Sequence, residues 1–518
     1  MQLFTRVLQN QYHDSVVLML AARELKQLPQ VADAAYMMGT AANKDLLQQG
    51  SLLDASAEAA RANDLIIAVR VVDGSPDILD QAQKLLSQHH PPITSEAGTS
   101  DTLRGVMRAH PDANIAVISV AGAYAAREAR EALVGGLHVL LFSDNVSLAD
   151  ELALKRLAVQ HGLLLMGPGA GTAILNGVGF GFANQVPRGP VGIVSAAGTG
   201  LQEVSTLLAK HGLGLSQAVG TGGRDLSQAV GGLMFFSAMD ALAADPPTEL
   251  IILISKPPDA DIAQKLLVKA GEIKKPVVVC LLGADAPPSL PANVHFTRTL
   301  EECALRAHAI YTKSTADIAQ IAAREDGALR QAAAALAAAR SPLRKYIRAL
   351  YSGGTLCYES QVIWQGTLPE PVYSNAPLDK KFILTDANQS QGHTAVDLGE
   401  EEFTVGRPHP MIDNELRITR MAQEAADPQA AVILLDVVLG YGAHSDPAGE
   451  LSKAIGKLRA EYPEVIWICS VTGTEGDPQV LSKSVNILKE AGVIVCGSNA
   501  QAARLAASLV QEGDTPHD

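Results

Sequence analysis

The sequence predicts an α/β protein built from several doubly wound parallel sheets. Short β-branched apolar runs alternate along the chain with glycine-containing turns and Ala- and Leu-rich stretches of helical period, the order found in βαβ units. The apolar runs are continuous, so helices should cover both faces of each sheet. At roughly 150 residues per domain, a chain of 518 residues holds about three to four such units.

Strands are expected at the clearest apolar runs, and unit boundaries where polar, proline-containing segments separate them. The predicted strands are 65–71, 114–120, 137–143, 163–166, 191–195, 250–255, 276–282, 432–438 and 465–471. The polar segment 87–101 is interpreted as a linker, and the Ala-rich stretch 328–340 as a helix. The units are a small N-terminal α/β domain at 1–95, domains at 102–186 and 187–327, a helical connector at 328–345 and a C-terminal domain at 346–518.

Composition and charge exclude several classes of function. Lys and Arg total 41 against 55 Asp and Glu, a net charge of −14, so nucleic acid is excluded as a partner. The apolar run 430–440 is short and interrupted by Asp436, which argues against a membrane span. The first residues lack the blocks of a signal peptide, so we expect a cytoplasmic protein. The five scattered cysteines, without a C-x-x-C pair, and the absence of an H-E-x-x-H motif predict no disulfide framework and no metal site.

The first glycine-rich turn, Gly198-Thr199-Gly200, lies between a predicted buried strand and a helix start. Backbone N–H groups and the positive helix end in such a turn favour an anion, and glycine lets a phosphate or carboxylate approach the backbone. We predict an anion site here. An ordinary tight turn between a strand and a helix remains the alternative.

A second turn, Gly222-Gly223-Arg224-Asp225, adds a guanidinium that can bind an oxyanion in bidentate fashion. If both turns belong to the same domain, we expect them to converge on one ligand. Alternatively, Arg224 and Asp225 pair with each other at a helix start, where Asp serves as a cap.

A third candidate is the proline-stiffened loop that contains Arg407 and His409. Prolines at 408 and 410 fix the backbone, so both side chains are held outside any helix or strand. Arg407 is predicted to hold a carboxylate or phosphate, and His409 to donate to an oxyanion or carry a proton. A solvated loop leading to a helix cap at Asp413 is the alternative.

The ordered motifs resemble the NDP-forming acyl-CoA synthetases of the succinyl-CoA synthetase superfamily, and more closely the FdrA family. The segments that carry the resemblance include LFSDNVSLADE, LLMGPGAG, VGIVSAAGTGLQE, GRDLSQAVGG, YSGGTL, VGRPHPMID and LLDVVLGYG. The resemblance implies a CoA-binding-like Rossmann unit, a flavodoxin-like ligase unit and a C-terminal flavodoxin-like unit similar to the synthetase β-subunit. It also implies that Glu203 is the acid that stands beside the phosphohistidine in synthetases.

The chain departs from the synthetases at the loop that carries their phosphohistidine. His295 falls near the corresponding distance, but Val294 and Phe296 predict a short strand, so we expect no phosphoryl transfer through His295. No ATP-grasp unit is recognisable in the C-terminal part.

The family resemblance implies a subunit of a carbamoyltransferase-type complex in ureide and purine nitrogen breakdown. This class uses carbamoyl phosphate with oxamate or oxalurate. The alternatives are an NDP-forming acyl-CoA synthetase and a non-catalytic scaffold that binds an acyl-CoA or anion. The expected ligands are a small anionic substrate, carbamoyl phosphate or CoA, with no covalent cofactor. Other subunits of the complex are expected as partners, and a homo-oligomer is expected.

Overall fold

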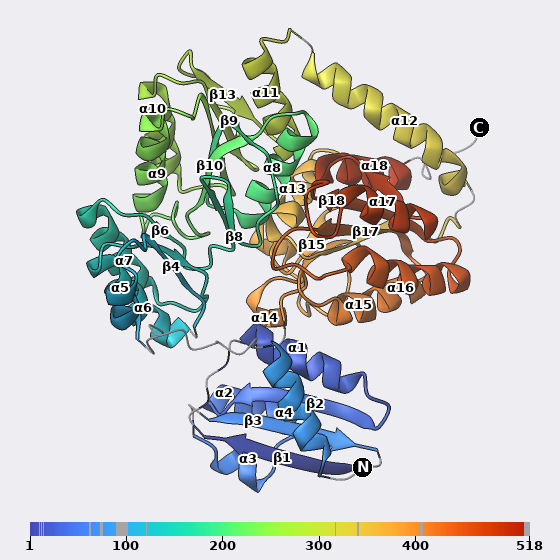
Figure 1. The fold of residues 1–518 in the computed structure, drawn as a ribbon. Coiled ribbons are helices and arrows are strands. Elements are labelled where there is room, and N and C mark those ends of the chain that lie inside the picture. Colours follow the sequence, from blue (N-terminus) through green and yellow to red (C-terminus); the bar gives the residue numbers. More distant parts are fainter. Residues whose placement is uncertain are drawn as a thin grey trace. The chain divides into compact units, whose positions relative to one another are not determined.

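The computed structural model describes residues 1–9, 11, 13, 15–61, 64–72, 76–89, 102–120, 122–315, 317–338, 341–404 and 408–511. The chain divides into two units, which are coloured along the sequence in Figure 1. Unit 1 comprises Met1–Pro111 and Glu401–Pro408, and unit 2 comprises Asp112–Glu400 and His409–Asp518. Each unit is described by itself.

Unit 1 contains a three-stranded antiparallel sheet in the order β1-β3-β2. The central strand β3 is apolar and coincides with the predicted run 65–71. Residues 87–89 of the predicted linker lie in α4, and 90–101 lie outside the described residues. The elements are β1 (Gln2–Leu8), α1 (Ser15–Lys26), β2 (Val31–Met38), α2 (Ala41–Gln49), α3 (Ala55–Ala59), β3 (Leu65–Val71), α4 (Ile78–His89), α5 (Leu103–Ala109) and α14 (Glu401–Thr404).

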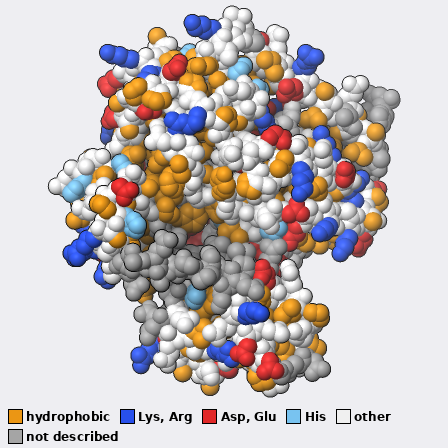
Figure 2. Space-filling model, viewed as in Figure 1, with side chains coloured by type: hydrophobic (Ala, Val, Ile, Leu, Met, Phe, Trp, Pro, Cys, Tyr) orange, Lys and Arg blue, Asp and Glu red, His pale blue; other side chains and the backbone are white. Residues whose placement is uncertain are grey.

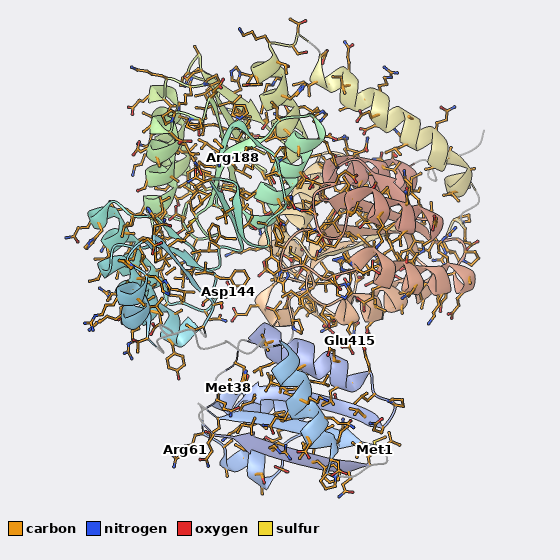
Figure 3. All side chains as sticks on the ribbon, in the orientation of Figure 1. Met1, Met38, Arg61, Asp144, Arg188 and Glu415 are labelled. Carbon is orange, nitrogen blue, oxygen red and sulfur yellow. The ribbon has the colours of Figure 1, made fainter. Side chains whose placement is uncertain are left out.

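Unit 2 begins with a three-stranded parallel sheet in the order β4-β5-β6. Its elements are β4 (Ile115–Ile118), α6 (Gly122–Val134), β5 (His138–Leu141), α7 (Leu148–His161) and β6 (Leu165–Met166). The turns after β5 and β6 lie together, because a Cβ at Gly169 would stand 2.5 Å from Oδ1 of Asp144. Asp144 is labelled in Figure 3.

The second sheet of unit 2 has the strand order β13-β12-β11-β9-β10-β7-β8. Five strands are parallel, and the hairpin β7–β8 adds antiparallel strands at one edge. The strands are β7 (Thr172–Leu175), β8 (Val178–Gly181), β9 (Arg188–Ser195), β10 (Leu215–Gly220), β11 (Leu250–Ser255), β12 (Val277–Leu281) and β13 (Val294–Thr297). The helices are α8 (Gly198–Lys210), α9 (Leu233–Ala244), α10 (Ala260–Glu272) and α11 (Leu300–Thr312), followed by α12 (Ile318–Ala338).

The third sheet of unit 2 is parallel throughout, in the order β15-β16-β14-β17-β18-β19. Its strands are β14 (Tyr346–Tyr351), β15 (Val372–Ser374), β16 (His393–Asp397), β17 (Ala430–Val438), β18 (Ile466–Thr472) and β19 (Ile494–Cys496). The other elements are α13 (Gly354–Gln365), the 3-10 helix η1 (Lys380–Phe382), α15 (Glu415–Ala426), α16 (Pro447–Glu461), α17 (Leu481–Glu490) and α18 (Asn499–Gln511).

The α/β class with parallel sheets is confirmed, and each predicted strand overlaps an observed one. The predicted helix at 328–340 lies largely within α12, which begins earlier, at Ile318. Helices α8, α11, α13 and α18 pack on one another in unit 2, and their apolar faces share one core with both large sheets. The ends of β9 and β14, the strands that precede α8 and α13, are therefore held rigidly.

The order of the strands locates the two places where a ligand is expected in unit 2. From β9 the chain passes to β10 on one side and to β11 on the other, so the order reverses at β9. The same reversal occurs at β14, between β16 and β17. In open α/β sheets, ligands bind outside the carboxyl ends of the strands at such reversals. Functional groups are therefore expected at the starts of α8 and α13.

The surface and the cysteines agree with the predicted character of the chain. On the face shown in Figure 2, Lys and Arg side chains are scattered among acidic and uncharged ones. A search of the described residues finds no helix long and apolar enough to cross a membrane. All five cysteines are free and buried.

Candidate functional site

The start of α8 presents unpaired backbone donors, as the first turn predicts. Ala197 donates its N–H to the Ser195 hydroxyl (3.0 Å). The amides of Gly198, Thr199 and Gly200 have no acceptor among the described residues, because they occupy the first turn of the helix. A Cβ at Gly198 would meet only the Thr172 hydroxyl, at 4.0 Å. This helix end is therefore open to an anion.

The start of α13 repeats the motif at the start of α8. Gly198-Thr199 is followed by Glu203, and Gly354-Thr355 is followed at the same spacing by Glu359. The site residues predicted from the sequence do not include this second turn. The spacing Gly-Thr-x-x-x-Glu, present in both turns, is the signal that pairs them.

The two helix starts lie against each other. Thr355 donates its N–H to the Thr199 hydroxyl (3.2 Å). A Cβ at Gly353 would stand 2.9 Å from Cγ2 of Thr199, and a Cβ at Gly200 would stand 2.9 Å from Cγ2 of Thr355. Glycine is needed at both positions because any side chain would push the helices apart. The carboxyl ends of the two large sheets therefore meet at one place.

Two aspartates from the strands on either side of β14 lie at the start of α13. Asp436 of β17 is fully buried and accepts hydrogen bonds from the Ser352 N–H (2.8 Å) and the Gly353 N–H (2.8 Å). Asp397 ends β16, and its Oδ2 would stand 2.3 Å from a Cβ at Gly354. The sequence had indicated Asp436 only as an interruption of an apolar run, and it gave no indication of Asp397.

Charged groups near Asp397 shift its pKa in opposite directions. Burial raises the pKa of Asp397 to about 7, and the carboxylates of Glu400 and Asp436 also raise it. Lys256, which follows β11, lowers the pKa but does not offset burial. Its ammonium group lies 5.6 Å from the centroid of the Tyr358 ring.

His409 lies next to the same aspartate. A Cβ at Gly399 would be 2.8 Å from His409 Nε2 and 3.1 Å from Asp397 Oδ1. Both side chains therefore lie against Gly399. The Met411 N–H donates to His409 Nδ1 (3.2 Å), which leaves the proton of the neutral ring on Nε2. Burial and the nearby Arg417 lower the pKa of His409 to about 4. At neutral pH the ring is therefore an uncharged donor.

His409 is also joined to the start of α8 through the hairpin. Its ring centroid lies 5.8 Å from that of Phe182, and the Phe182 carbonyl accepts the Thr172 hydroxyl (3.2 Å). Thr172 is the residue nearest to the Cβ position of Gly198. Arg407, predicted to act with His409, lies outside the described residues.

The second glycine-rich turn adjoins the first. The Thr221 N–H donates to the Ser195 carbonyl (2.8 Å), and a Cβ at Gly223 would stand 3.9 Å from the Ala196 carbonyl oxygen. Gly222, at φ +88°, packs on Pro168. The structure therefore brings Gly222 and Gly223 beside the start of α8.

Arg224 is engaged with the α7 region. Its Nε pairs with Glu151 (2.8 Å), and its Nη2 donates to the Val146 carbonyl (2.8 Å). The alternative pairing of Arg224 with Asp225 is not what the structure shows, because Asp225 pairs with Lys155 (2.7 Å). About half of the Arg224 side chain remains exposed.

Glu203 is buried beneath the site and hydrogen-bonded to the C-terminal sheet. It accepts the Thr472 hydroxyl and the N–H of Asn499 (3.0 Å), the first residue of α18. Its counterpart Glu359 accepts the N–H of Leu300, the first residue of α11 (2.6 Å). Each glutamate thus binds the start of a helix belonging to the opposite sheet, where a carboxylate is favoured.

His295 lies on the short strand β13, as its neighbours predict. It is separated from the sheet's central strands by β12 and belongs to the edge. We expect no phosphohistidine after incubation with labelled ATP, GTP or phosphate plus CoA thioester. The measurement is acid-labile protein-bound label. Stoichiometric label that disappears in His295→Ala would contradict this expectation.

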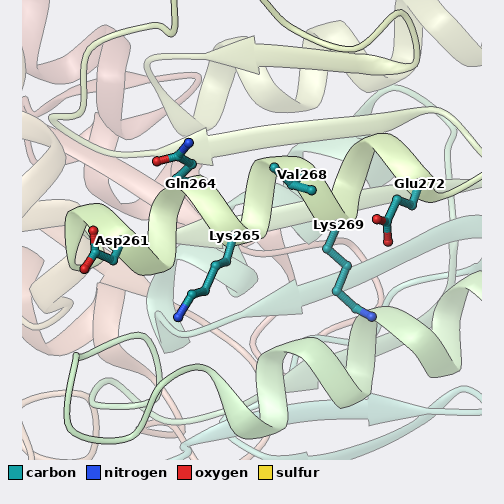
Figure 4. Close-up of a pocket in the computed structure, with 6 residues that line it drawn as sticks. All are labelled: Asp261, Gln264, Lys265, Val268, Lys269 and Glu272. Atoms are coloured by element: carbon teal, nitrogen blue, oxygen red, sulfur yellow. The ribbon is translucent and has the colours of Figure 1, made fainter.

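A surface hollow lies elsewhere, along α10 (Figure 4). Its volume is about 480 Å³, and every lining residue comes from that single helix. Lys269 in this hollow pairs with Asp240 (2.5 Å). The hollow brings together no side chains from the strand ends, and we do not assign the site to it.

The comparisons with known proteins bear on the family of the chain. The uncharacterized protein YahF of Escherichia coli (strain K12) is 42% identical over 512 residues, which cover 98% of each chain. The chain belongs to the FdrA family. This FdrA-family chain also lies within the NDP-forming acyl-CoA synthetase superfamily, since the family model described as CoA-ligase matches residues 350–509.

More distant relatives of the FdrA-family chain match only part of it. The alpha subunit of an ADP-forming succinate–CoA ligase from Aquifex aeolicus is 31% identical over 182 residues, which cover 34% of this chain and 58% of that subunit. The apo structure of the dinucleotide forming acetyl-coenzyme A synthetase 1 of Ca. Korarchaeum cryptofilum is 15% identical with a TM-score of 0.29, covering 80% of this chain and 88% of that one.

A second family model, described as the AllF heavy metal-associated domain, matches residues 1–102 of the FdrA-family chain. These residues contain no cysteine, so they lack the thiolate ligands that soft heavy metals prefer. Among the described residues, no group of three or more His, Cys, Asp and Glu is arranged to hold a metal ion. The residues present therefore do not fit a heavy-metal site.

Proposed function

We propose that this chain is a subunit of a carbamoyltransferase-type complex that binds carbamoyl phosphate at the start of α8. The observation that carries the proposal is the open set of amides at Gly198, Thr199 and Gly200, on a helix start that contacts the start of α13, where an uncharged histidine donor and a buried aspartate lie. Transfer of a carbamoyl group needs preorganised donors for the phosphate and for the oxyanion, and it needs no phosphohistidine.

Each predicted residue has a role in this proposal. Gly198, Thr199 and Gly200 bind the phosphate, and the adjoining Gly222 and Gly223 widen the donor surface. Arg224 and Arg407 supply positive charge to the anion, and His409 Nε2 donates to the developing oxyanion. Glu203 does not touch substrate in this proposal. It holds α8 and α18 together from beneath.

The wider role proposed is in ureide and purine nitrogen breakdown, with an oxamate- or oxalurate-type amide as the carbamoyl acceptor. The complex would be cytoplasmic, with other subunits as partners and further copies of this chain in a homo-oligomer. The domains proposed from the sequence, 1–95, 102–186, 187–327 and 346–518 with the connector 328–345, would each supply one part of that assembly.

An NDP-forming acyl-CoA ligase is the second candidate, and the CoA-ligase match at 350–509 favours it. A non-catalytic CoA- or anion-binding scaffold is the third. The full chain, alone and purified with its partner subunits, should be assayed with carbamoyl phosphate plus an amide acceptor, and separately with ATP, CoA and a carboxylic acid. Phosphate release in the first assay supports the carbamoyltransferase. CoA thioester in the second supports the ligase, and neither product supports the scaffold.

Gly198→Val tests the anion site directly. The added side chain should occupy the space beside the open amides, while the backbone there allows a side chain. Because a helix end contributes up to about 2 kcal/mol to a bound anion, phosphate affinity should fall by about tenfold or more, as measured by calorimetry. Gly456→Val, at an exposed glycine of α16 with open space around it, is the matched control. Equal phosphate affinity in folded Gly198→Val would contradict the site.

A further inference from the structure

Two buried carboxylates lie at the start of α13, and only one of them is fully paired. Asp436 accepts two backbone N–H groups, the Ser352 hydroxyl (3.0 Å) and Nη2 of Arg417 (3.2 Å). Arg417 is itself buried, with 2% of its surface exposed. This carboxylate is therefore fixed in position, and its charge is balanced by a guanidinium and by the helix end.

Asp397 is buried to a similar degree, with 3% of its surface exposed, but its environment differs. Its Oδ1 accepts the Gly399 N–H (2.9 Å), and it forms no ion pair with any described residue. Its backbone is fixed from both sides, because the Asp397 N–H donates to Asn375 Oδ1 (2.9 Å) and the Asn375 amide donates to the Asp397 carbonyl (2.9 Å). Asp397 is thus held rigidly, and no described residue donates a hydrogen bond to its second carboxylate oxygen, Oδ2.

The unpaired oxygen faces the meeting point of the two helix starts. Oδ2 of Asp397 lies against Gly354, and the Thr199 side chain lies against the preceding residue, Gly353. Thr199 belongs to the open turn that we propose binds phosphate. A ligand bound at Thr199 would extend toward Asp397 or toward the ring of His409. These two side chains lie together, because both are close to Gly399.

We propose that Asp397 is the catalytic base that removes a proton from the acceptor nitrogen. This inference rests on the proposed function. The acceptor amide nitrogen attacks the carbonyl carbon of carbamoyl phosphate, and a C–N bond forms. The bond between that carbon and the oxygen that bridges to phosphorus breaks, and its electron pair leaves with the phosphate. The proton passes from nitrogen to Asp397 and then to the departing phosphate, which restores the carboxylate.

The groups around Asp397 suit this role. Burial and two carboxylates hold the pKa of Asp397 near neutrality, where a base of this kind is most effective. His409 stays uncharged there, so it does not neutralise the aspartate. Among the described residues, the charged or titratable groups that face Asp397 are Lys256, Cys357, Glu400, His409 and Asp436.

Asp397→Asn in the full chain, with its partner subunits, tests the proposal. We expect kcat for carbamoyl transfer to fall by about 10²- to 10⁴-fold with little change in the KM for carbamoyl phosphate. The residual rate should lose the ionisation near pH 7, which a purely structural role would not remove. Asp386→Asn, at an exposed turn residue, is the matched control and should keep full turnover. A variant that retains the wild-type pH profile would overturn the assignment.

A second measurement needs no turnover, so it separates this inference from the proposed function. Infrared difference spectra of the wild type should show a carboxyl group that titrates near pH 7 and is absent in Asp397→Asn, while the signal of Glu359, near pH 8, remains in both. Saturating inorganic phosphate should shift that titration upward, because a nearby anion disfavours the carboxylate. Carbamoyl transfer that is absent while the phosphate-linked titration is present would overturn the proposed function and the base role, and would leave only the placement of Asp397 beside the anion. A titration that phosphate does not move would overturn the placement of Asp397 beside the anion.

Discussion

Lys155→Met is expected to lower the free energy of unfolding by about 3–5 kcal/mol, because it leaves the buried carboxylate of Asp225 without its cation. The Lys155 ammonium is fully buried and contacts Glu151 (2.8 Å), Asp225 (2.7 Å) and the Thr221 carbonyl (3.1 Å). Burial already raises the pKa of Asp225, and Lys155 opposes that rise. The loss should appear as a lower urea midpoint at pH 8.

The matched control is Arg156→Met on the same helix, where the side chain is exposed and a change within about 0.5 kcal/mol is expected. Adding Asp225→Asn to Lys155→Met should cost less than the sum of the single changes, because the two residues are in contact. The defect should also shrink as the pH falls and Asp225 takes up a proton. A loss under about 1 kcal/mol at pH 8 would show that this network does not hold α7 to the β10 turn.

Much of unit 2 could be predicted because its central strands are uninterrupted apolar runs. The strand 250–255 matches β11 at both ends, since all six residues are buried between helices. Strand β14 was missed because it carries Arg348 in its interior, and the short strand β16 was missed because His393 and Asp397 stand at its two ends. Arg348 is tolerated there because it pairs with Glu424 (3.2 Å) and Asp427 (2.6 Å) from another part of the chain. Such pairing cannot be seen in a local pattern.

The candidate site was predictable in part for the same reason. The open turn at Gly198–Gly200 carries its own local signal, a strand followed by small residues and a helix. Asp397 carries none, because it ends a short polar strand and its partners Gly354 and His409 come from distant segments. The repeated Gly-Thr-x-x-x-Glu motif would have pointed to α13, but only the fold brings Asp397 and Asp436 to that helix start.

Asn499→Asp, an isosteric change, should destabilise the protein by about 3–5 kcal/mol at pH 8, because it places an unpaired carboxyl group between two buried ones. Asn499 donates its backbone N–H to Glu203 (3.0 Å) and its amide to Glu359 (2.8 Å). Burial raises the pKa of Glu359 to about 8, although the Asn499 hydrogen bond lowers it. Aspartate at 499 loses that donor and adds repulsion.

The pH dependence has a definite sign. An unfolded glutamate titrates near about 4.3, so between roughly pH 4 and 8 the native state binds more protons through Glu359 than the unfolded state does. Stability from this group therefore falls as the pH rises across that window, and a second buried acid at 499 makes the fall steeper. The difference between Asn499→Asp and the wild type, measured by urea unfolding, should be larger at pH 8 than at pH 5.

Asn486→Asp, at an exposed position of α17, should show neither the loss nor the pH dependence. A defect that grew toward low pH would mean that Asn499 does not separate the two glutamates, and that the helix starts are joined through other contacts.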